Sequence, residues 1–181
     1  MNGKRKEGVR FLTEAAVIAA IYALLTMFLA PISYGSVQFR ISEALTILPI
    51  FTPAAIPGLT IGCFLANITS PLGVIDWIVG PSATLLAAIC TYLVRKIRFK
   101  SAPWLAPLPP VIFNALIVGA ELTIVYSSPT PETFFALFLP MALSVGLGEL
   151  VVCYALGLPI STVLVKLNIE NTIFRQYQTV K

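Results

Sequence analysis

The sequence contains no histidine, few charges and no paired cysteines, and each shortage excludes a kind of chemistry. Its 181 residues include no His, which excludes histidine metal sites, histidine proton relays and a Ser-His-Asp triad. Cys63, Cys90 and Cys153 stand singly inside apolar segments, where we expect small buried side chains. The motifs GxxxxGK[ST], HExxH and GxSxG are also missing, so we expect no P-loop, no enzyme, no metal site and no cofactor.

The scarcity of charge indicates a membrane protein. Only 11% of the residues are charged and 57% are hydrophobic, with a mean hydropathy of +0.90. Soluble domains carry about 25% charged residues. Several apolar runs approach the ~18 residues of a membrane-spanning helix. These runs are continuous rather than alternating, which favours helices over a barrel. The net charge of +4 does not indicate a nucleic-acid partner, because the basic residues flank the apolar runs as topology signals do.

We expect one all-α integral membrane domain over residues 1–181, with six transmembrane helices. The expected helices cover about 11–30, 41–51, 53–69, 76–94, 104–126 and 134–165. A break at Thr52-Pro53 is expected because one helix over 41–70 would be about 45 Å long, whereas the hydrocarbon core is ~30 Å thick. The last helix is expected to be long and tilted or to kink near Pro140 or Pro159. The first run exceeds the apolar core of a secretory signal, so we expect it to be retained.

The basic residues predict the orientation in the plasma membrane. The N-terminal arm, the segment Arg95–Lys100 and the polar tail from Lys166 all follow the positive-inside rule if six helices are present. Both termini are then cytoplasmic, and Arg40 is the one basic residue of the outer loops.

Polar side chains from five of the expected helices collect in the outer half of the membrane. Ionisable groups inside a membrane are costly and are functional candidates by default. Glu121 and Glu149 have no Lys or Arg between Lys100 and Lys166 to pair with locally. We therefore predict a pocket that opens outward, with these candidate substrate-binding residues: Arg40, Glu43, Asn67, Asp76, Trp77, Asn114, Glu121 and Glu149.

Most of these residues also have a purely structural explanation. Arg40 could extend to lipid headgroups, or pair with Glu43 three residues later. Trp77 could belong to an aromatic belt, and Asp76 could cap its helix. The two asparagines could form hydrogen bonds between helices. The sequence leaves these alternatives open.

Small residues form two rows on the first helix. Small residues four positions apart let another helix approach closely, either inside the protein or from a partner. One row contains Ala15, Ala19 and Ala23, and the other contains Ala16 and Ala20. Gly58 and Gly62 form a GxxxG motif with the same ambiguity.

Two adjoining segments resemble a known family. Val37–Asn67 (VQFRISEALTILPIFTPAAIPGLTIGCFLAN) and Ser70–Ala88 (SPLGVIDWIVGPSATLLAA) are similar to the QueT family. The resemblance covers about residues 9–165, and its sharpest motif is QFRISEAL at Gln38–Leu45. Members of this family are substrate-binding S components of energy-coupling factor (ECF) transporters, assigned to queuosine precursors.

The resemblance implies a six-helix S component that captures a queuosine precursor from outside the cell. Its partners would be a transmembrane coupling subunit and two cytoplasmic ATPases, with the alanine rows of the first helix docking on the coupling subunit. Queuosine precursors are 7-deazaguanines, whose N1–H and 2-amino group can both donate to one carboxylate while O6 accepts from an arginine or amide. We expect Glu121 and Glu43 to bind the ligand, Arg40 to orient it, and Trp77 or Phe39 to stack on its ring. A second carboxylate would suit a cationic aminomethyl group.

Three other functions remain open. The protein could be an S component for a different vitamin-like ligand. It could be a self-sufficient secondary transporter or channel, since a short Pro/Gly-broken helix beside a polar cluster is typical of transporters. It could also be a membrane scaffold whose small-residue faces only pack.

Overall fold

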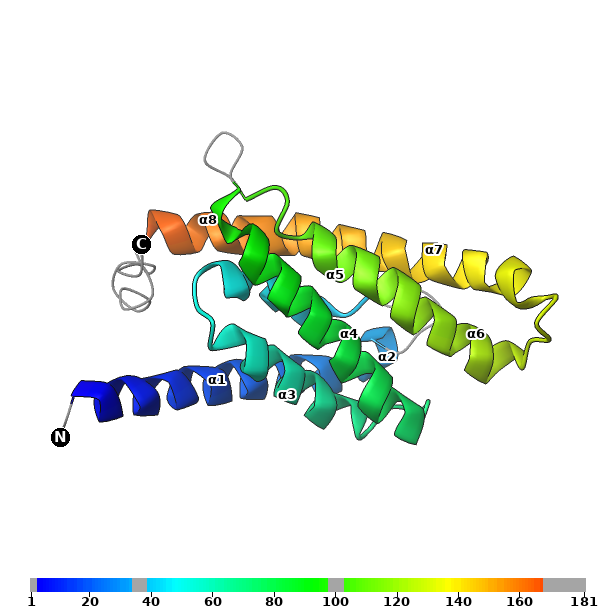
Figure 1. Ribbon diagram of the computed structural model, residues 1–181, viewed down its shortest axis with the longest axis horizontal. Coiled ribbons are helices and arrows are strands. Elements are labelled where there is room, and N and C mark those ends of the chain that lie inside the picture. The colour runs from blue at the N-terminus through cyan, green and yellow to red at the C-terminus, as the bar shows by residue number, and fades with distance from the viewer. Residues whose placement is uncertain (1–2, 34–38, 98–102, 168–181) are drawn as a thin grey trace.

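The computed structural model describes residues 3–33, 39–97 and 103–167, and these residues form six consecutive helical segments (Figure 1). Several segments change their winding along their length: η1 and η2 are 3-10 helices, and η3 and η4 are π-helices. The segments are α1 (Gly3–Phe28) with the short α2 (Ala30–Ser33); η1 (Ile41–Ile50); α3 (Ala55–Asn67); α4 (Val74–Leu93) with η2 (Val94–Lys96); α5 (Leu108–Phe113), η3 (Asn114–Val118) and α6 (Gly119–Ser127); and α7 (Phe134–Val152), η4 (Cys153–Gly157) and α8 (Leu158–Lys166).

The observed helices differ from the expected ones in places that have a physical reason. α1 begins at Gly3 rather than near 11, because the basic arm is rich in helix-forming residues and Arg10 pairs with Glu14 one turn later. The π segment η4 ends just before Pro159, which has no amide hydrogen to continue a regular ladder. Parts of the expected loop before Arg40, of the basic segment 95–100 and of the tail lie outside the described residues.

The helix expected at 41–51 is η1, a ten-residue 3-10 helix in the interior of the bundle. It contacts α1, α3, α4, α7, α8 and η4, and none of its ten residues is exposed. Most of its residues are apolar, and a helix with apolar residues on all sides belongs in an interior. Runs of 3-10 helix longer than three or four residues are uncommon and often mark a hinge or strain. η1 is therefore an interior element that contacts most of the other helical segments.

Three hydrogen bonds join α1 to η1 and the residues that follow it. Tyr22 donates its hydroxyl proton to Oε1 of Glu43. The hydroxyls of Thr26 and Ser42 share a hydrogen bond of 2.6 Å. Two residues after the end of η1, the hydroxyl of Thr52 donates to Oε2 of Glu14 at 3.0 Å. We call these contacts the α1–η1 hydrogen bonds.

The two alanine rows of α1 have different environments. A Cβ atom on Gly58 would lie 2.8 Å from the carbonyl oxygen of Ala15, and one on Gly62 would lie 2.8 Å from that of Ala19. The GxxxG motif of α3 thus packs directly against the row that includes Ala23, which is buried. Ala16 and Ala20 are exposed on the opposite face. Packing inside the protein accounts for the first row and leaves the second row available to a partner.

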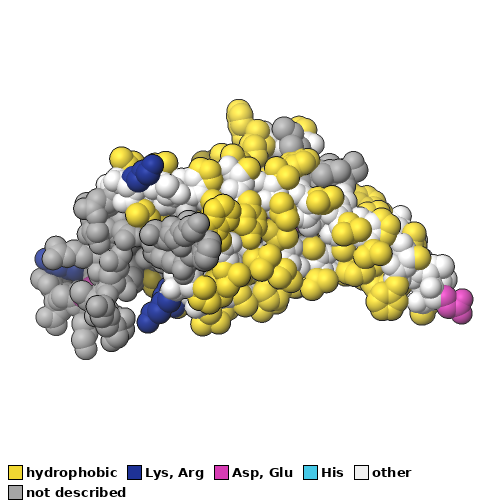
Figure 2. Space-filling view, turned by 90° about the horizontal axis from the view of Figure 1, so that it is seen from above, with side chains coloured by type: hydrophobic (Ala, Val, Ile, Leu, Met, Phe, Trp, Pro, Cys, Tyr) yellow, Lys and Arg dark blue, Asp and Glu magenta, His cyan; other side chains and the backbone are white. Residues whose placement is uncertain are grey.

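The outer surface of the helices is mostly apolar (Figure 2). Large side chains such as Phe28 and Phe135 are 89% and 75% exposed. Among the described residues, four stretches are long and apolar enough to cross a membrane: Arg5–Phe28, Val74–Lys96, Leu108–Ser127 and Phe134–Lys166. The helices η1 and α3 are shorter. This arrangement is that of a multi-pass membrane protein.

Candidate ligand-binding site

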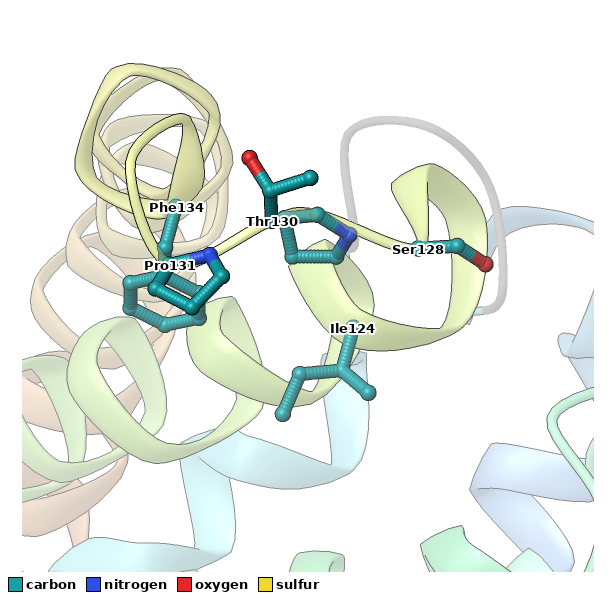
Figure 3. Close-up of a pocket in the computed structure, with 6 residues that line it drawn as sticks. Ile124, Ser128, Thr130, Pro131 and Phe134 are labelled. Carbon is teal, nitrogen blue, oxygen red and sulfur yellow. The ribbon is translucent and has the colours of Figure 1, made fainter.

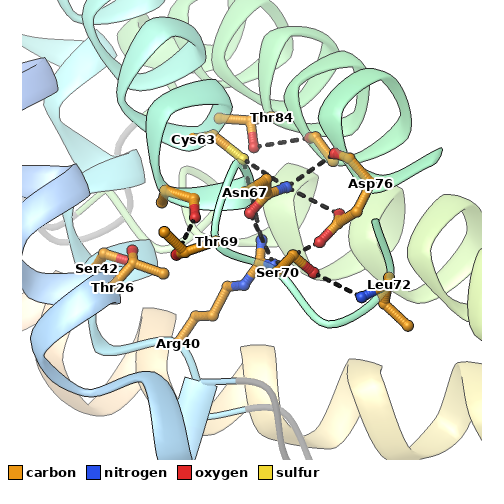
Figure 4. A network of polar contacts seen from close by, with 12 residues as sticks. Thr26, Arg40, Ser42, Cys63, Asn67, Thr69, Ser70, Leu72, Asp76 and Thr84 are labelled. Carbon is orange, nitrogen blue, oxygen red and sulfur yellow. Dashed lines mark hydrogen bonds and ion pairs between the residues drawn. The ribbon is translucent and has the colours of Figure 1, made fainter. Parts of the chain in front are cut away.

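A buried arginine lies at the start of η1. Arg40 has an extended backbone and a side chain that is only 5% exposed. Its Nη2 donates to Oδ1 of Asn67 at 3.1 Å and lies 3.7 Å from Oδ2 of Asp76 (Figure 4). The side chain therefore points into the protein rather than toward headgroups, and it forms an ion pair with Asp76.

Asn67 connects this arginine to α4. It is the last residue of α3, and its Nδ2 donates to the backbone oxygen of Asp76 at 3.0 Å and to Oδ1 at 2.8 Å. Asn67 thus forms the expected hydrogen bond between helices, and its Oδ1 also accepts a hydrogen bond from the guanidinium of Arg40. Asp76 does not cap its helix, because the N-cap is Gly73 and no side chain bonds there.

Gly80 makes room for this network. A Cβ atom at this position would lie 2.2 Å from Nδ2 of Asn67 and 2.8 Å from Oδ1 of Asp76. Gly80 is one turn after Asp76 in α4, so both residues face the same side of the helix. Sequence reasoning missed Gly80, although its spacing from a buried acid was visible.

A second carboxylate lies within η1 itself. Glu43 is fully buried, and its Oε1 accepts the hydrogen bond from Tyr22. Its Oε2 has no hydrogen-bond partner among the described residues. Tyr22 was also missed, yet it lies on the buried stripe of α1 one turn after Ala19, where a hydroxyl needs a partner.

Both π segments begin at polar residues of this cluster. Asn114 starts η3 and lies beside the carboxylates of Glu43 and Glu149. Cys153 starts η4, and its thiol donates to Oε2 of Glu149 at 3.5 Å. π segments occur frequently at functional sites. Cys153, expected to be only a small buried side chain, is therefore a member of the cluster, and Cys63 likewise contacts Nη1 of Arg40 at 3.9 Å.

Glu121 differs from the other buried acids. Its side chain is 2% exposed, and neither carboxylate oxygen has a hydrogen-bond partner within the part of the chain that the structure describes. It lies on α6 near enough to Asp76 and Arg40 to interact with both electrostatically. A buried carboxylate without partners is costly, so Glu121 is a candidate for contact with a ligand.

Trp77 is half-buried in the first turn of α4. Its indole Nε1–H is buried, and no described residue accepts from it. An indole with an unused donor and an apolar face suits a flat, polar ligand. The other seven candidate residues are all buried.

The charges of the site are unbalanced. In the described ranges, five acidic or basic side chains are buried, and Arg40 is the only cation among them. It interacts electrostatically with all four carboxylates: those of Glu43, Asp76, Glu121 and Glu149. Such a site favours a ligand that is rich in N–H donors or positively charged.

A hollow on the surface has no comparable chemistry. It lies between the end of α6 and the start of α7, has a volume of about 500 Å³ and contains no charged side chain (Figure 3). Within the described part of the chain, no group of three His, Cys, Asp or Glu residues could hold a metal ion. The polar cluster around Arg40 is therefore the candidate site.

A multi-pass helical protein with acids gathered around one buried arginine has the construction of a membrane protein that binds a polar solute. The chain matches the family described as QueT transporter over residues 12–166, and it belongs to that family. Membership places the chain among transporters rather than enzymes.

One relative supports the same assignment. The "Queuosine precursor transporter QueT" of Lactococcus lactis subsp. cremoris (strain MG1363) is 45% identical over 73 residues, which are 39% of this chain and 43% of that protein. The chain therefore aligns with less than half the length of that relative. No solved structure matches the chain.

Proposed function

We propose that the protein is the substrate-binding S component of an ECF importer and that it captures a queuosine precursor from outside the cell. Membership of the QueT transporter family supports this function. The observation that carries the ligand assignment is that four buried carboxylates share Arg40 as the one buried cation of the described residues.

These carboxylates match the hydrogen-bonding groups of a 7-deazaguanine. One carboxylate can accept from both the N1–H and the 2-amino group, and Glu43 has an oxygen, Oε2, with no partner among the described residues. Asn114 lies beside Glu43 and supplies an amide donor for O6. Arg40, fixed by Asn67 and Asp76, orients the carboxylates. Trp77 stacks on the ring.

The proposal includes six membrane spans with both termini in the cytoplasm. η1 and α3 form the second and third spans, although each is shorter than the other four. The described Lys and Arg side chains other than Arg40 gather toward one end of the molecule, away from the end where α6 and α7 meet (Figure 2). This separation supports the positive-inside orientation.

The exposed alanine row is the proposed docking face for the coupling subunit. Ala16 and Ala20 line a shallow groove on α1 with Val9, Leu12, Thr13 and Val17. Small residues there allow a partner helix to approach closely. The two cytoplasmic ATPases would supply the energy for transport, because the sequence has no P-loop motif.

Thermal unfolding of the detergent-purified chain tests this function. Ligand bound only by the folded state raises stability by RT ln(1 + [L]/Kd), about 2.7 kcal/mol at a hundredfold excess over Kd. We expect a 7-deazaguanine to raise the Tm and guanine to leave it unchanged. A shift with an unrelated vitamin alone would retain the S component and reject the ligand. ATP-independent uptake that collapses with a protonophore would instead identify a secondary transporter.

A further inference from the structure

We propose that the ligand carries a positive charge on its 7-substituent and that Glu121 receives this charge. The inference rests on the proposed function, since it specifies which 7-deazaguanines the site accepts. It starts from one observation: Glu121 is 2% exposed and both of its carboxylate oxygens lack a hydrogen-bond partner among the described residues.

The other three buried acids have partners within the protein. Asp76 accepts from Asn67 at 2.8 Å and lies 3.7 Å from Nη2 of Arg40. Glu43 accepts from Tyr22. Glu149 accepts from the thiol of Cys153 at 3.5 Å. Only Glu121 is left with two unused oxygens inside the described part of the fold.

A guanine-like edge does not account for Glu121. That edge donates from N1 and the 2-amino group, and a single carboxylate accepts both hydrogen bonds. Glu43 is placed for this role, since its Oε2 is available and Asn114 lies beside it. Glu121 is on a different segment, α6, and its electrostatic neighbours are Asp76 and Arg40. Glu121 is therefore placed to contact a different part of the ligand.

The chain supplies no second cation for this position. Arg40 is the single buried base of the described residues, and its Nη atoms contact Asn67, Asp76 and Cys63. The sequence has no Lys or Arg between Lys100 and Lys166, the stretch that contains Glu121. A protonated amine on the ligand supplies one positive charge and N–H donors for the unused oxygens. A neutral substituent such as a nitrile supplies neither.

Two ligands with the same ring separate these possibilities. 7-Aminomethyl-7-deazaguanine is cationic at neutral pH, whereas 7-cyano-7-deazaguanine is neutral. We expect the purified full-length chain to bind the aminomethyl compound about tenfold or more tightly than the cyano compound, as one charged hydrogen bond allows. Isothermal titration calorimetry in detergent measures both affinities.

The variant Glu121→Gln keeps the shape of the side chain and removes its charge. We expect it to bind the aminomethyl compound about tenfold or more weakly than the wild type, so that the preference over the cyano compound is lost, since the charged contact is removed. Binding of the cyano compound also shows that the variant is folded. Glu132→Gln is the matched control, because Glu132 is exposed in the loop before α7 and its substitution should preserve the preference.

The outcomes distinguish this inference from the proposed function. Equal binding of the two compounds by the wild type, or an unchanged preference in Glu121→Gln, would overturn the role of Glu121 and leave the 7-deazaguanine assignment intact. Binding of neither compound would overturn both. If Glu121→Gln does not fold, Glu121→Asp decides, because it keeps the charge: a retained preference supports the inference, and equal binding of both compounds rejects it.

Discussion

The hydroxyl of Tyr22 in α1 donates a hydrogen bond to Oε1 of Glu43 in η1, and both side chains are fully buried. This bond joins the helix that carries the proposed docking face to the element that carries Glu43, the carboxylate proposed to bind the ligand. Oε2 of Glu43 has no partner among the described residues. This oxygen is therefore available to a ligand, while Oε1 is held by Tyr22.

Tyr22→Phe should weaken both the fold and the binding of ligand. The substitution removes the donor and keeps the ring, so Oε1 of Glu43 is left buried without its partner. We expect a loss of about 1–3 kcal/mol in the free energy of unfolding. Chemical denaturation in detergent, with and without ligand, measures it. Tyr126→Phe is the control, because Tyr126 is exposed. Equal effects of the two substitutions would contradict the assigned role of Tyr22.

Gly80→Ala should abolish ligand binding more readily than it abolishes folding. The new Cβ would overlap Nδ2 of Asn67, which must then move away from Asp76 and Arg40. We expect a loss of about 1–3 kcal/mol from overpacking and at least tenfold weaker binding, because one hydrogen bond to a charged group is lost.

Gly8→Ala is the matched control for Gly80→Ala. A Cβ atom on Gly8 meets nothing within 4 Å. Alanine there should stabilise α1 slightly, by up to about 1 kcal/mol. If Gly80→Ala binds ligand like the wild type, the network of Asn67 and Asp76 is not needed for recognition.

Arg40→Gln should destabilise the protein strongly. It removes the one cation found among the described buried side chains and leaves Asp76 without its ion pair. Removing one partner of a buried pair costs about 3–5 kcal/mol. The double variant Arg40→Gln/Asp76→Asn should recover part of this loss, which a double-mutant cycle of unfolding free energies measures. No recovery would mean that the pair is not coupled.

Two neighbouring alanines of α1 should respond differently to enlargement. Ala15→Leu forces a larger side chain into a buried position of α1 and should cost about 1–3 kcal/mol of stability. Ala16→Leu places the same side chain on the exposed groove, so stability and ligand affinity should remain unchanged. Co-purification with the coupling subunit should fall for Ala16→Leu alone among the folded variants. If Ala16→Leu co-purifies with the coupling subunit as well as the wild type does, the docking face is not at Ala16.

The sequence selected buried polar residues and predicted that they gather, but it did not predict which of them are in contact. A rule about depth and charge was enough to select Arg40 and the acids, because ionisable groups in apolar helices are rare. The partners depend on contacts between distant parts of the chain, such as Arg40 with Asn67 or Tyr22 with Glu43, which helix packing determines. Hydroxyl and glycine positions carry no charge signal, so Tyr22 and Gly80 were missed.

The winding of η1 was also outside the reach of the sequence. Its apolar run predicted a short helix at the observed place, but hydrophobicity does not distinguish a 3-10 helix from an α-helix in so few residues. Its burial depends on the helices that pack against it. The break that follows at Thr52-Pro53 was signalled by proline, whose effect is local, and α3 begins at Ala55.

The 3-10 winding of η1 also sets a length. Ten residues wound in this way extend about 20 Å, whereas the same residues in an α-helix would extend about 15 Å. Arg40 precedes η1, and Thr52, which bonds to Glu14 of α1, follows it. Rewinding η1 as an α-helix would draw these two ends together by about 5 Å. η1, which follows Arg40, is thus longer as a 3-10 helix than it would be as an α-helix. Thr52, two residues after its end, is bonded to α1, the helix that carries the proposed docking face.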